Sequence, residues 1–152
     1  MTTFIGVIII IISTLFGYIL SEKFAYRKNF YKNFFEFNKN LKSEVSFTKA
    51  SILSIIDNKD SNDFIEIAKE YISLNEIKSQ YKHIKQSEID FIKSYLSSIF
   101  DVDDKTLLKN IDYYTVKINE IYNVAIYEDK KYRTLYVKIG FLLGLLVFVI
   151  LI

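Results

Sequence analysis

Uncharged apolar runs stand near both ends of the chain, and helical patterns of apolar and polar positions fill the stretch between them. Residues 4–20 carry no charge and are about as long as a helix needs to cross a bilayer core of roughly 30 Å. Residues 139–152 are apolar but shorter, and they reach spanning length when residues 135–137 enter the bilayer and Lys138 extends its ammonium to the interface. The pattern predicts a transmembrane helix at each end.

The middle of the chain begins with a long helical pattern. Between Tyr31 and Ile55, apolar and small side chains recur at alternating spacings of three and four residues, which places them on one face of a helix. Because this pattern can continue directly from the first apolar run, we expect nearly one helix over residues 4–56. Residues 57–62, with the sequence DNKDSN, are turn formers and are predicted to end it.

Two shorter helices and one long helix are predicted after this turn. Residues 63–80 form an amphipathic segment, and Ser87 is expected to cap the next helix, with Asp90 where a capping box has glutamate. The last pattern is heptad-like over residues 107–139, with a polar interruption at Glu128, and it leads straight into the second apolar run.

These segments contain no strong helix breaker, because proline is absent and the four glycines all lie in or beside the apolar runs. Two long helices anchored in one membrane should pair antiparallel, with the shorter helices completing the core. We therefore predict an all-α protein: a transmembrane helix over residues 1–21, a helical bundle built on two long antiparallel helices over residues 22–134, and a second transmembrane helix over residues 135–152.

The orientation in the membrane follows from the basic residues. A cleaved signal peptide is disfavoured, because no basic residue precedes the first apolar core and no small-x-small pattern precedes Lys23. Basic side chains follow the first run and precede the second: Lys23, Arg27, Lys28, Lys32, Lys130, Lys131, Arg133 and Lys138. The positive-inside rule then predicts a cytoplasmic middle and both termini on the outer face.

The composition argues against nucleic-acid binding and against catalysis. Twenty basic and 18 acidic residues are well mixed, so the net charge of +2 creates no strong field for nucleic acid. Cysteine is absent, His83 is the only histidine and stands in a polar connection, and no phosphate loop or nucleophile elbow is present. We predict a protein that is not an enzyme and needs no metal or other cofactor.

An acidic cluster, Asp101, Asp103 and Asp104, has two interpretations. It is a poor calcium loop, because Lys105 takes a ligand position and Thr106 replaces the glycine that the loop requires. The other interpretation, which we favour, is a cap for the last long helix.

Small residues in the apolar runs point to close helix packing. Gly140 and Gly144 form a GxxxG step in the second run, and Ser13 and Gly17 form a small-xxx-small step in the first. The sequence leaves open whether these steps pack within one chain, between copies in a homo-oligomer, or against another membrane protein.

The order of motifs resembles that of the stage III sporulation protein AB family. An apolar span with glycines is followed by Arg27 and a helix that leads to Glu44–Phe47, similar to the family's Glu-Ile-x-aromatic motif; near the other end, a basic stretch precedes Gly140, Gly144 and aliphatic residues. The middle departs from the family, because residues 99–103 keep only an aspartate of its Leu-Gly-x-x-Asp motif and the proline usual after the first helix is missing.

This resemblance implies a platform subunit of the complex that joins mother cell and forespore, with a cytoplasmic domain similar to the platform proteins of type II secretion and type IV pilus systems. It implies a sporulation ATPase and other channel membrane subunits as partners, and a location in the outer forespore membrane. Our candidates for partner contacts are acidic side chains: Glu44, Asp101, Asp103 and Asp104.

Two rival functions remain at this point. The first is an envelope spacer or division regulator, in which the paired helices act as a membrane-anchored coiled coil. The second is a small pore-former, which is disfavoured because the spans carry no internal charge and the long soluble part has no use in a pore.

Overall fold

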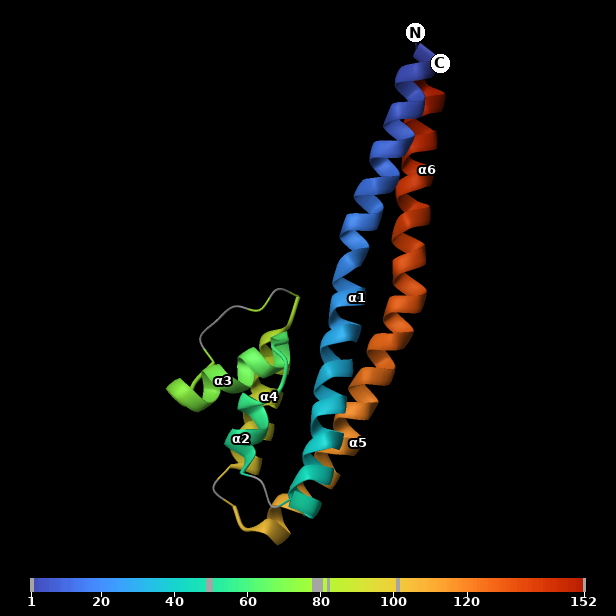
Figure 1. The fold of residues 1–152 in the computed structure, drawn as a ribbon. Coiled ribbons are helices and arrows are strands. Elements are labelled where there is room, and N and C mark those ends of the chain that lie inside the picture. Colours follow the sequence, from blue (N-terminus) through green and yellow to red (C-terminus); the bar gives the residue numbers. More distant parts are fainter. Residues whose placement is uncertain (1, 49–50, 78–80, 82, 101, 152) are drawn as a thin grey trace. The chain divides into compact units, whose positions relative to one another are not determined.

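The computed structural model describes residues 2–48, 51–77, 81, 83–100 and 102–151. Its elements are α1 (Thr2–Thr48), α2 (Ile52–Asp57), α3 (Asp63–Leu74), α4 (Gln86–Ile99), α5 (Asp104–Glu128), a π-helical turn η1 (Asp129–Arg133) and α6 (Thr134–Leu151) (Figure 1). All regular structure in these described residues is helical, which confirms the predicted all-helical class.

The chain divides into two compact units. Unit 1 contains both ends of the chain, Met1–Lys28 and Val124–Ile152, and unit 2 contains the middle, Asn29–Asn123. The predicted boundaries at residues 21/22 and 134/135 describe where the chain enters a membrane. The boundaries of the two units describe packing alone, so the predicted ones stay predictions.

The first long helix is shorter than the sequence predicted. It was expected to run to Ile56, but α1 ends at Thr48 and Ser51 starts a separate helix, α2. Ser51 has an extended backbone, and its hydroxyl accepts a hydrogen bond from the Ser54 N–H at 3.3 Å, so it caps α2. The apolar pattern therefore belongs to two helices, α1 and α2, and the second contributes Ile55 and Ile56 to the core.

The boundaries of α3 are set by two asparagines. Asn62 accepts hydrogen bonds from the N–H groups of Phe64 and Ile65, both at 3.1 Å, and so caps the start of the helix. The predicted end near residue 80 is wrong, since α3 stops at Leu74. Asn75 adopts a left-handed backbone conformation, with φ 52°, that ends helices.

The predicted cap of α4 is also wrong. Ser87 lies inside the first turn, and the helix begins at Gln86. The backbone N–H of Lys85 donates to the Glu88 carboxylate at 3.0 Å, so glutamate serves in the capping box although no serine or threonine stands at the cap position.

Aromatic side chains from four helices form the centre of unit 2. Phe34 of α1 stacks on Phe64 of α3, with ring centroids 4.2 Å apart and an interplanar angle of 15°, and meets Tyr95 of α4 edge-on at 4.9 Å. All three rings are fully buried. Tyr114 of α5 contacts Tyr95 at 5.3 Å, so the aromatic cluster joins α1, α3, α4 and α5 within this unit.

Two buried polar contacts fix side chains in this core. Asn38 of α1 is fully buried and donates to the Ile111 carbonyl at 3.2 Å and to the Thr115 hydroxyl of α5 at 2.7 Å. Glu88, which is 8% exposed, accepts a hydrogen bond from the Tyr31 hydroxyl at 2.9 Å in addition to that from Lys85. The start of α4 is thereby tied to α1.

Glu88→Ala should lower the free energy of unfolding by roughly 2 kcal/mol, because one substitution removes the acceptor of two buried hydrogen bonds. Tyr31→Phe removes only one of these bonds and should cost about 1 kcal/mol. Urea unfolding of the full chain in detergent, followed by circular dichroism, measures both. Asp90→Ala changes an exposed carboxylate on the same helix and serves as the control; a Glu88→Ala loss no larger than that of the control would contradict this account.

Candidate functional site

The small residues of the two apolar runs come together in unit 1. The Ser13 hydroxyl of α1 donates to the Gly140 carbonyl of α6 at 2.6 Å. A Cβ added to Gly140 would lie 2.5 Å from the Ser13 carbonyl oxygen, and one added to Gly17 would lie 2.5 Å from the Tyr136 carbonyl oxygen. A Cβ added to Gly144 would lie 2.7 Å from the Cα of Ile10. The two helices therefore touch through their backbones, within one chain.

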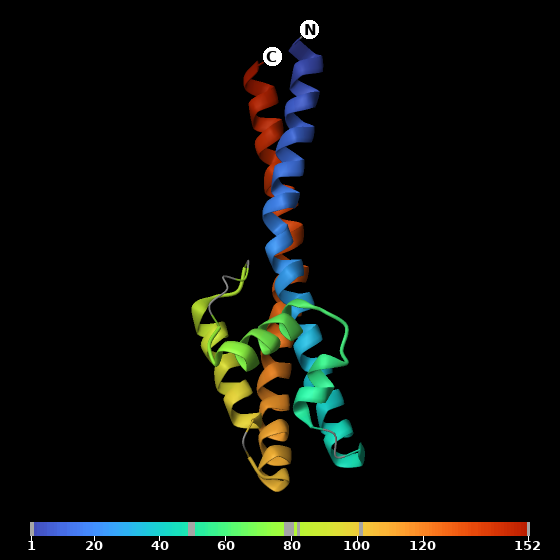
Figure 2. The same ribbon diagram turned by 60° about the vertical axis from the view of Figure 1, so that its left-hand side comes forward.

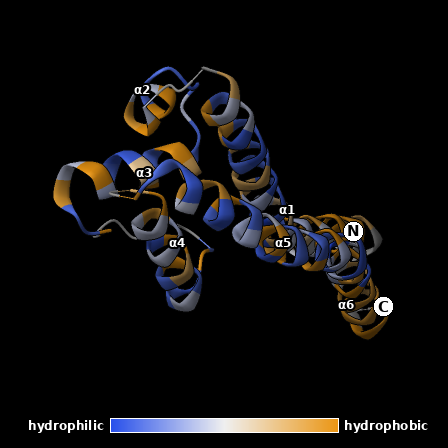
Figure 3. Cartoon of the chain, turned by 90° about the horizontal axis from the view of Figure 1, so that it is seen from below, coloured by the Kyte–Doolittle hydropathy of each residue, from blue (hydrophilic) through white to orange (hydrophobic). Residues whose placement is uncertain are grey.

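The outer surface of this pair is apolar. In unit 1, α1 and α6 lie side by side with their N and C ends together (Figures 1 and 2), and hydrophobic residues gather around these ends in Figure 3. Among the described residues, two helical stretches, Phe4–Phe47 and Asp104–Ile150, each contain a window long and apolar enough to cross a membrane. Only 17% and 11% of these windows are buried, whereas the core helix of a soluble protein is mostly buried. The protein is thus suited to membrane association.

Two adjacent ion pairs follow the glycine-packed segment in unit 1. The Arg27 guanidinium pairs with Glu128, and the Lys28 ammonium pairs with Asp129. The Asp129 side chain is only 11% exposed, so removal of its cation would leave a poorly hydrated carboxylate. Of the eight basic residues that flank the apolar runs, Arg27 and Lys28 are neutralised within unit 1. Asp129 was not predicted, because it stands in a charged stretch between Glu128 and Lys130 where the pattern placed no buried position.

Other cations of unit 1 lie over aromatic rings. The Lys23 ammonium is 5.0 Å from the centre of the Tyr136 ring, and the Arg133 guanidinium carbon is 5.4 Å from that of Tyr18. Lys131 contacts the rings of Tyr127 and Tyr132 at 5.4 and 5.3 Å. Tyrosines and cations in this combination are typical of the membrane interface.

The π-helical turn changes which residues of α6 face α1. The heptad pattern predicted Leu135 and Ile139 on the buried face, but they are 43% and 45% exposed, and Gly140 is buried instead. A π turn holds one residue more than an α turn, so it moves every later position on the buried face one residue along the chain. The correction brings the glycines to the contact and leaves Leu135 and Ile139 outside.

The predicted partner-contact residues lie in unit 2 in different local settings. Glu44 of α1 pairs with Lys59, which follows α2, at 3.1 Å. Asp103 accepts a hydrogen bond from the Thr106 N–H at 3.2 Å, so it caps α5, and Asp104 is exposed in the first turn. Asp101 lies outside the described residues.

The cap also affects the charge of Asp103. Hydrogen bonds from the Thr106 hydroxyl and from its backbone N–H hold the pKa of Asp103 below its usual value. A lowered pKa means that the cap is fully formed at neutral pH and weakens only as the pH falls through that lowered pKa.

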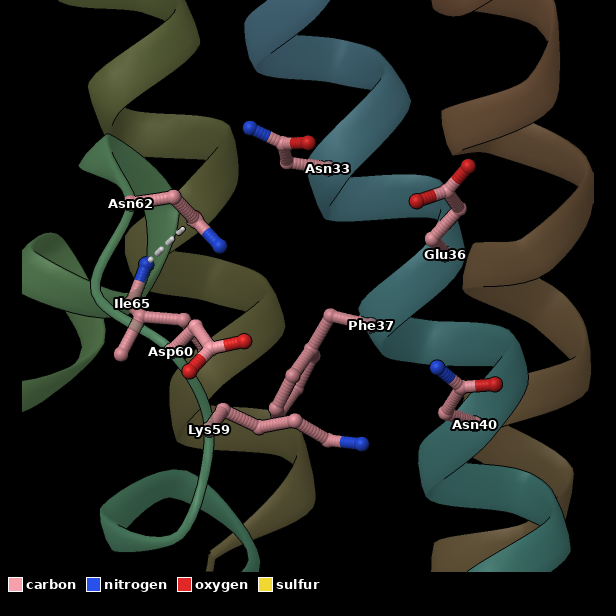
Figure 4. A pocket seen from close by; sticks show the side chains of 8 residues that line it. All are labelled: Asn33, Glu36, Phe37, Asn40, Lys59, Asp60, Asn62 and Ile65. Carbon is pink, nitrogen blue, oxygen red and sulfur yellow. Dashed lines mark hydrogen bonds between the residues drawn. The ribbon is translucent and has the colours of Figure 1, made fainter.

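A polar hollow of about 160 Å³ lies beside the Glu44–Lys59 pair, between α1 and the chain around the start of α3 (Figure 4). Besides Phe37, its lining is mostly amide and carboxyl side chains: Asn33, Glu36, Asn40, Lys59, Asp60, Asn62 and Ile65. Such groups donate and accept hydrogen bonds but offer no nucleophile with a base beside it. The arrangement suits recognition of a polar surface.

The part of the chain that the structure describes holds no group of three His, Asp or Glu side chains placed to bind a metal. His83 is exposed, with φ 66°, in the connection between α3 and α4.

Comparison with known proteins gives one family. A family model for stage III sporulation protein AB matches residues 54–152, about two thirds of the chain. The chain belongs to the stage III sporulation protein AB family. Its role is accordingly in stage III of sporulation. No curated protein and no solved structure matches the chain.

The match to the stage III sporulation protein AB family covers the α6 side of the helix contact but not its α1 side. Gly140, Gly144, the π turn, Asp103 and Asp104 lie inside the matched range, whereas Ser13, Gly17, Arg27 and Glu44 lie before it.

Deletion of Lys138 should destabilise unit 1, whereas deletion of Lys130 should not. The π turn absorbs one additional residue, so removal of Lys130 converts it to an α turn and keeps Gly140 facing Ser13. Removal of Lys138, which follows the turn, rotates the later helix by about 100° and turns Gly140 away from Ser13. Bulky side chains then enter the backbone contact, at a cost of about 1–3 kcal/mol. Thermal unfolding of the full chain in detergent measures the loss.

Lys138→Ala is the matched control for the Lys138 deletion, because Lys138 is exposed and its substitution keeps the residue count. A melting temperature that falls as far on deletion of Lys130 as on deletion of Lys138 would show that the π turn does not absorb the additional residue.

Proposed function

We propose that the protein is a non-enzymatic platform subunit of the mother cell to forespore channel, on which an ATPase and other channel subunits assemble. The family membership supports this, because it assigns a stage III role. The protein would lie in the mother-cell-derived outer forespore membrane, with unit 2 in the cytoplasm and both termini on the outer face.

In this proposal both apolar segments cross the membrane and the middle of the chain forms a helical bundle on two long antiparallel helices. The observation that carries it is the backbone contact of α1 and α6 within one chain. A hairpin packed this closely by its own small residues does not need a second copy to complete its membrane part. Its outward apolar side chains stay available for lipid and for other membrane subunits.

Unit 2 would supply the docking surface for the ATPase. The polar hollow and the Glu44–Lys59 pair offer one recognition surface, and the exposed carboxylates of Asp103 and Asp104 at the start of α5 offer a second. Polar and charged groups at the rim of an interface determine the association rate and the specificity more than the affinity. Such an interface suits a platform that binds and releases an ATPase.

A heat-resistant spore count on a strain that lacks the gene, combined with microscopy of engulfment, tests the function. We expect few spores and forespores that stall after engulfment. Normal spore numbers with an altered vegetative envelope would refute the proposal and favour the anchored spacer or division regulator.

Asp103→Asn separates capping from docking, because asparagine caps helices about as well as aspartate but carries no charge. If the carboxylate contacts the ATPase, recovery of the ATPase with the tagged full chain from sporulating cells should fall about fivefold, since a lost rim charge mainly slows association. Thermal unfolding should change little.

Asp90→Asn removes an exposed charge from α4 and is the control for net charge. ATPase recovery that is normal with Asp103→Asn and low only with Asp103→Ala would assign Asp103 to capping alone and remove it from the docking surface.

A further inference from the structure

A second surface of unit 1 has the features of a ligand site. A shallow groove of about 400 Å³ between α1 and α6 is lined by Thr14, Val137, Lys138, Phe141 and Leu142. The surface that it presents is apolar. Its volume lies within the range of about 300–1,000 Å³ that is usual for ligand clefts.

The groove is apolar although a threonine lines it. The Thr14 hydroxyl donates to the Ile10 carbonyl one turn earlier, at 2.7 Å, so its hydrogen-bonding hydrogen is used within α1. Phe141 and Leu142 are 45% and 61% exposed and form the other wall. A hydrocarbon chain is the ligand that such a lining accepts without loss of hydrogen bonds.

Cations lie next to the groove. Lys138 is part of the lining itself. Arg133 stands four residues before Val137, and it donates to the Tyr18 hydroxyl at 3.2 Å; Tyr18 in turn stands four residues after Thr14. Arg133 and Tyr18 therefore each lie one helical turn from a residue that lines the groove, on the same helix face. Both lie on the side of the groove away from the ends of the chain.

Arg133 and Lys138 differ from Arg27 and Lys28 of α1. Arg27 and Lys28 are neutralised by Glu128 and Asp129, whereas none of the ion pairs among the described residues includes Arg133 or Lys138. Tyr18 accepts from Arg133, so its own O–H hydrogen remains available to an additional acceptor. Two cations and a hydroxyl beside an apolar groove are complementary to an anionic headgroup with an acyl chain.

We propose that this groove binds one anionic phospholipid. Arg133, Lys138 and the Tyr18 hydroxyl hold the phosphate, and an acyl chain lies along Val137, Phe141 and Leu142 past Thr14. A zwitterionic phospholipid binds more weakly, because its headgroup brings a cation to the same two side chains. The inference rests on the membrane insertion in the proposed function, and it adds a specific lipid partner to it.

Native mass spectrometry of the full chain in detergent tests the site, with equal amounts of phosphatidylglycerol and phosphatidylcholine added. We expect the chain to retain one phosphatidylglycerol preferentially. The double variant Arg133→Gln/Lys138→Gln should bind it about 30-fold more weakly, since each cation near a membrane surface contributes about 1 kcal/mol of attraction.

Two controls separate the site from general attraction to basic residues. Lys130→Gln/Lys131→Gln removes the same charge from the same unit but from residues that do not line the groove, and it should leave retention unchanged. Leu142→Trp keeps every charge and fills the groove, and it should lower retention. Glycerol 3-phosphate, which has the phosphate without acyl chains, should not displace the lipid.

Equal retention of the two lipids by the unaltered chain, or equal loss in the two double variants, would overturn the site. Displacement by glycerol 3-phosphate would overturn the role of the groove. Alkaline carbonate extraction of membranes that contain the chain is read separately: release of the chain into the supernatant would refute the membrane-spanning proposal itself, whereas a chain that resists extraction and shows no lipid preference refutes only this inference.

Discussion

Backbone contact between α1 and α6 is the constraint on which the rest of unit 1 depends. The helices touch where Gly17 and Gly140 lack a Cβ and where the Ser13 hydroxyl reaches the Gly140 carbonyl. If the pair crosses a bilayer, as we propose, the hydrophobic effect does not draw its apolar helices together, so close packing and such hydrogen bonds supply the attraction. Each helix has only one face that permits this approach, and the relative rotation of the pair follows from it.

The π turn places the glycines of α6 against α1, although they do not follow the heptad register of α5. The residues up to Ala125 follow a heptad register, and the glycines of α6 stand one residue out of that register. One additional residue in η1 brings them onto the contact face. The ion pairs of Glu128 and Asp129 with Arg27 and Lys28 lie at the same point, so the change of register coincides with the place where internal charges are paired. Arg133 and Lys138 have no such internal partner among the described residues, and in our proposal they bind a lipid headgroup.

Periodicity predicted the helical class and most helices, because burial of one face of each helix leaves a direct trace in the order of residues. Local hydrogen bonding was harder to predict. Ser87 was predicted to cap α4, but the Glu88 carboxylate caps it by accepting a hydrogen bond from the Lys85 N–H. The same carboxylate is held in place by the Tyr31 hydroxyl of α1, a contact that the local sequence does not reveal. The small residues of the candidate site were chosen from spacing alone, and the structure brings all four together. The burial of Asp129 carries no local signal, because its partner Lys28 stands 101 residues away in sequence.

Disulfide formation tests the register of α1 on α6 most directly. The chain has no cysteine, so any disulfide must join introduced residues. A Cβ at Gly144 would lie 3.4 Å from that of Ile10 but only 2.7 Å from the Ile10 Cα, so the helices must part slightly to admit it. That shift brings the two Cβ atoms into the range of about 3.5–4.5 Å that a disulfide needs. The account predicts that Ile10→Cys/Gly144→Cys oxidises rapidly to a cross-linked monomer in membranes, while Ile10→Cys/Leu143→Cys, with the second cysteine one residue out of register and exposed, oxidises slowly. Faster oxidation of the Leu143 pair, or a product that is mainly a dimer, would contradict it.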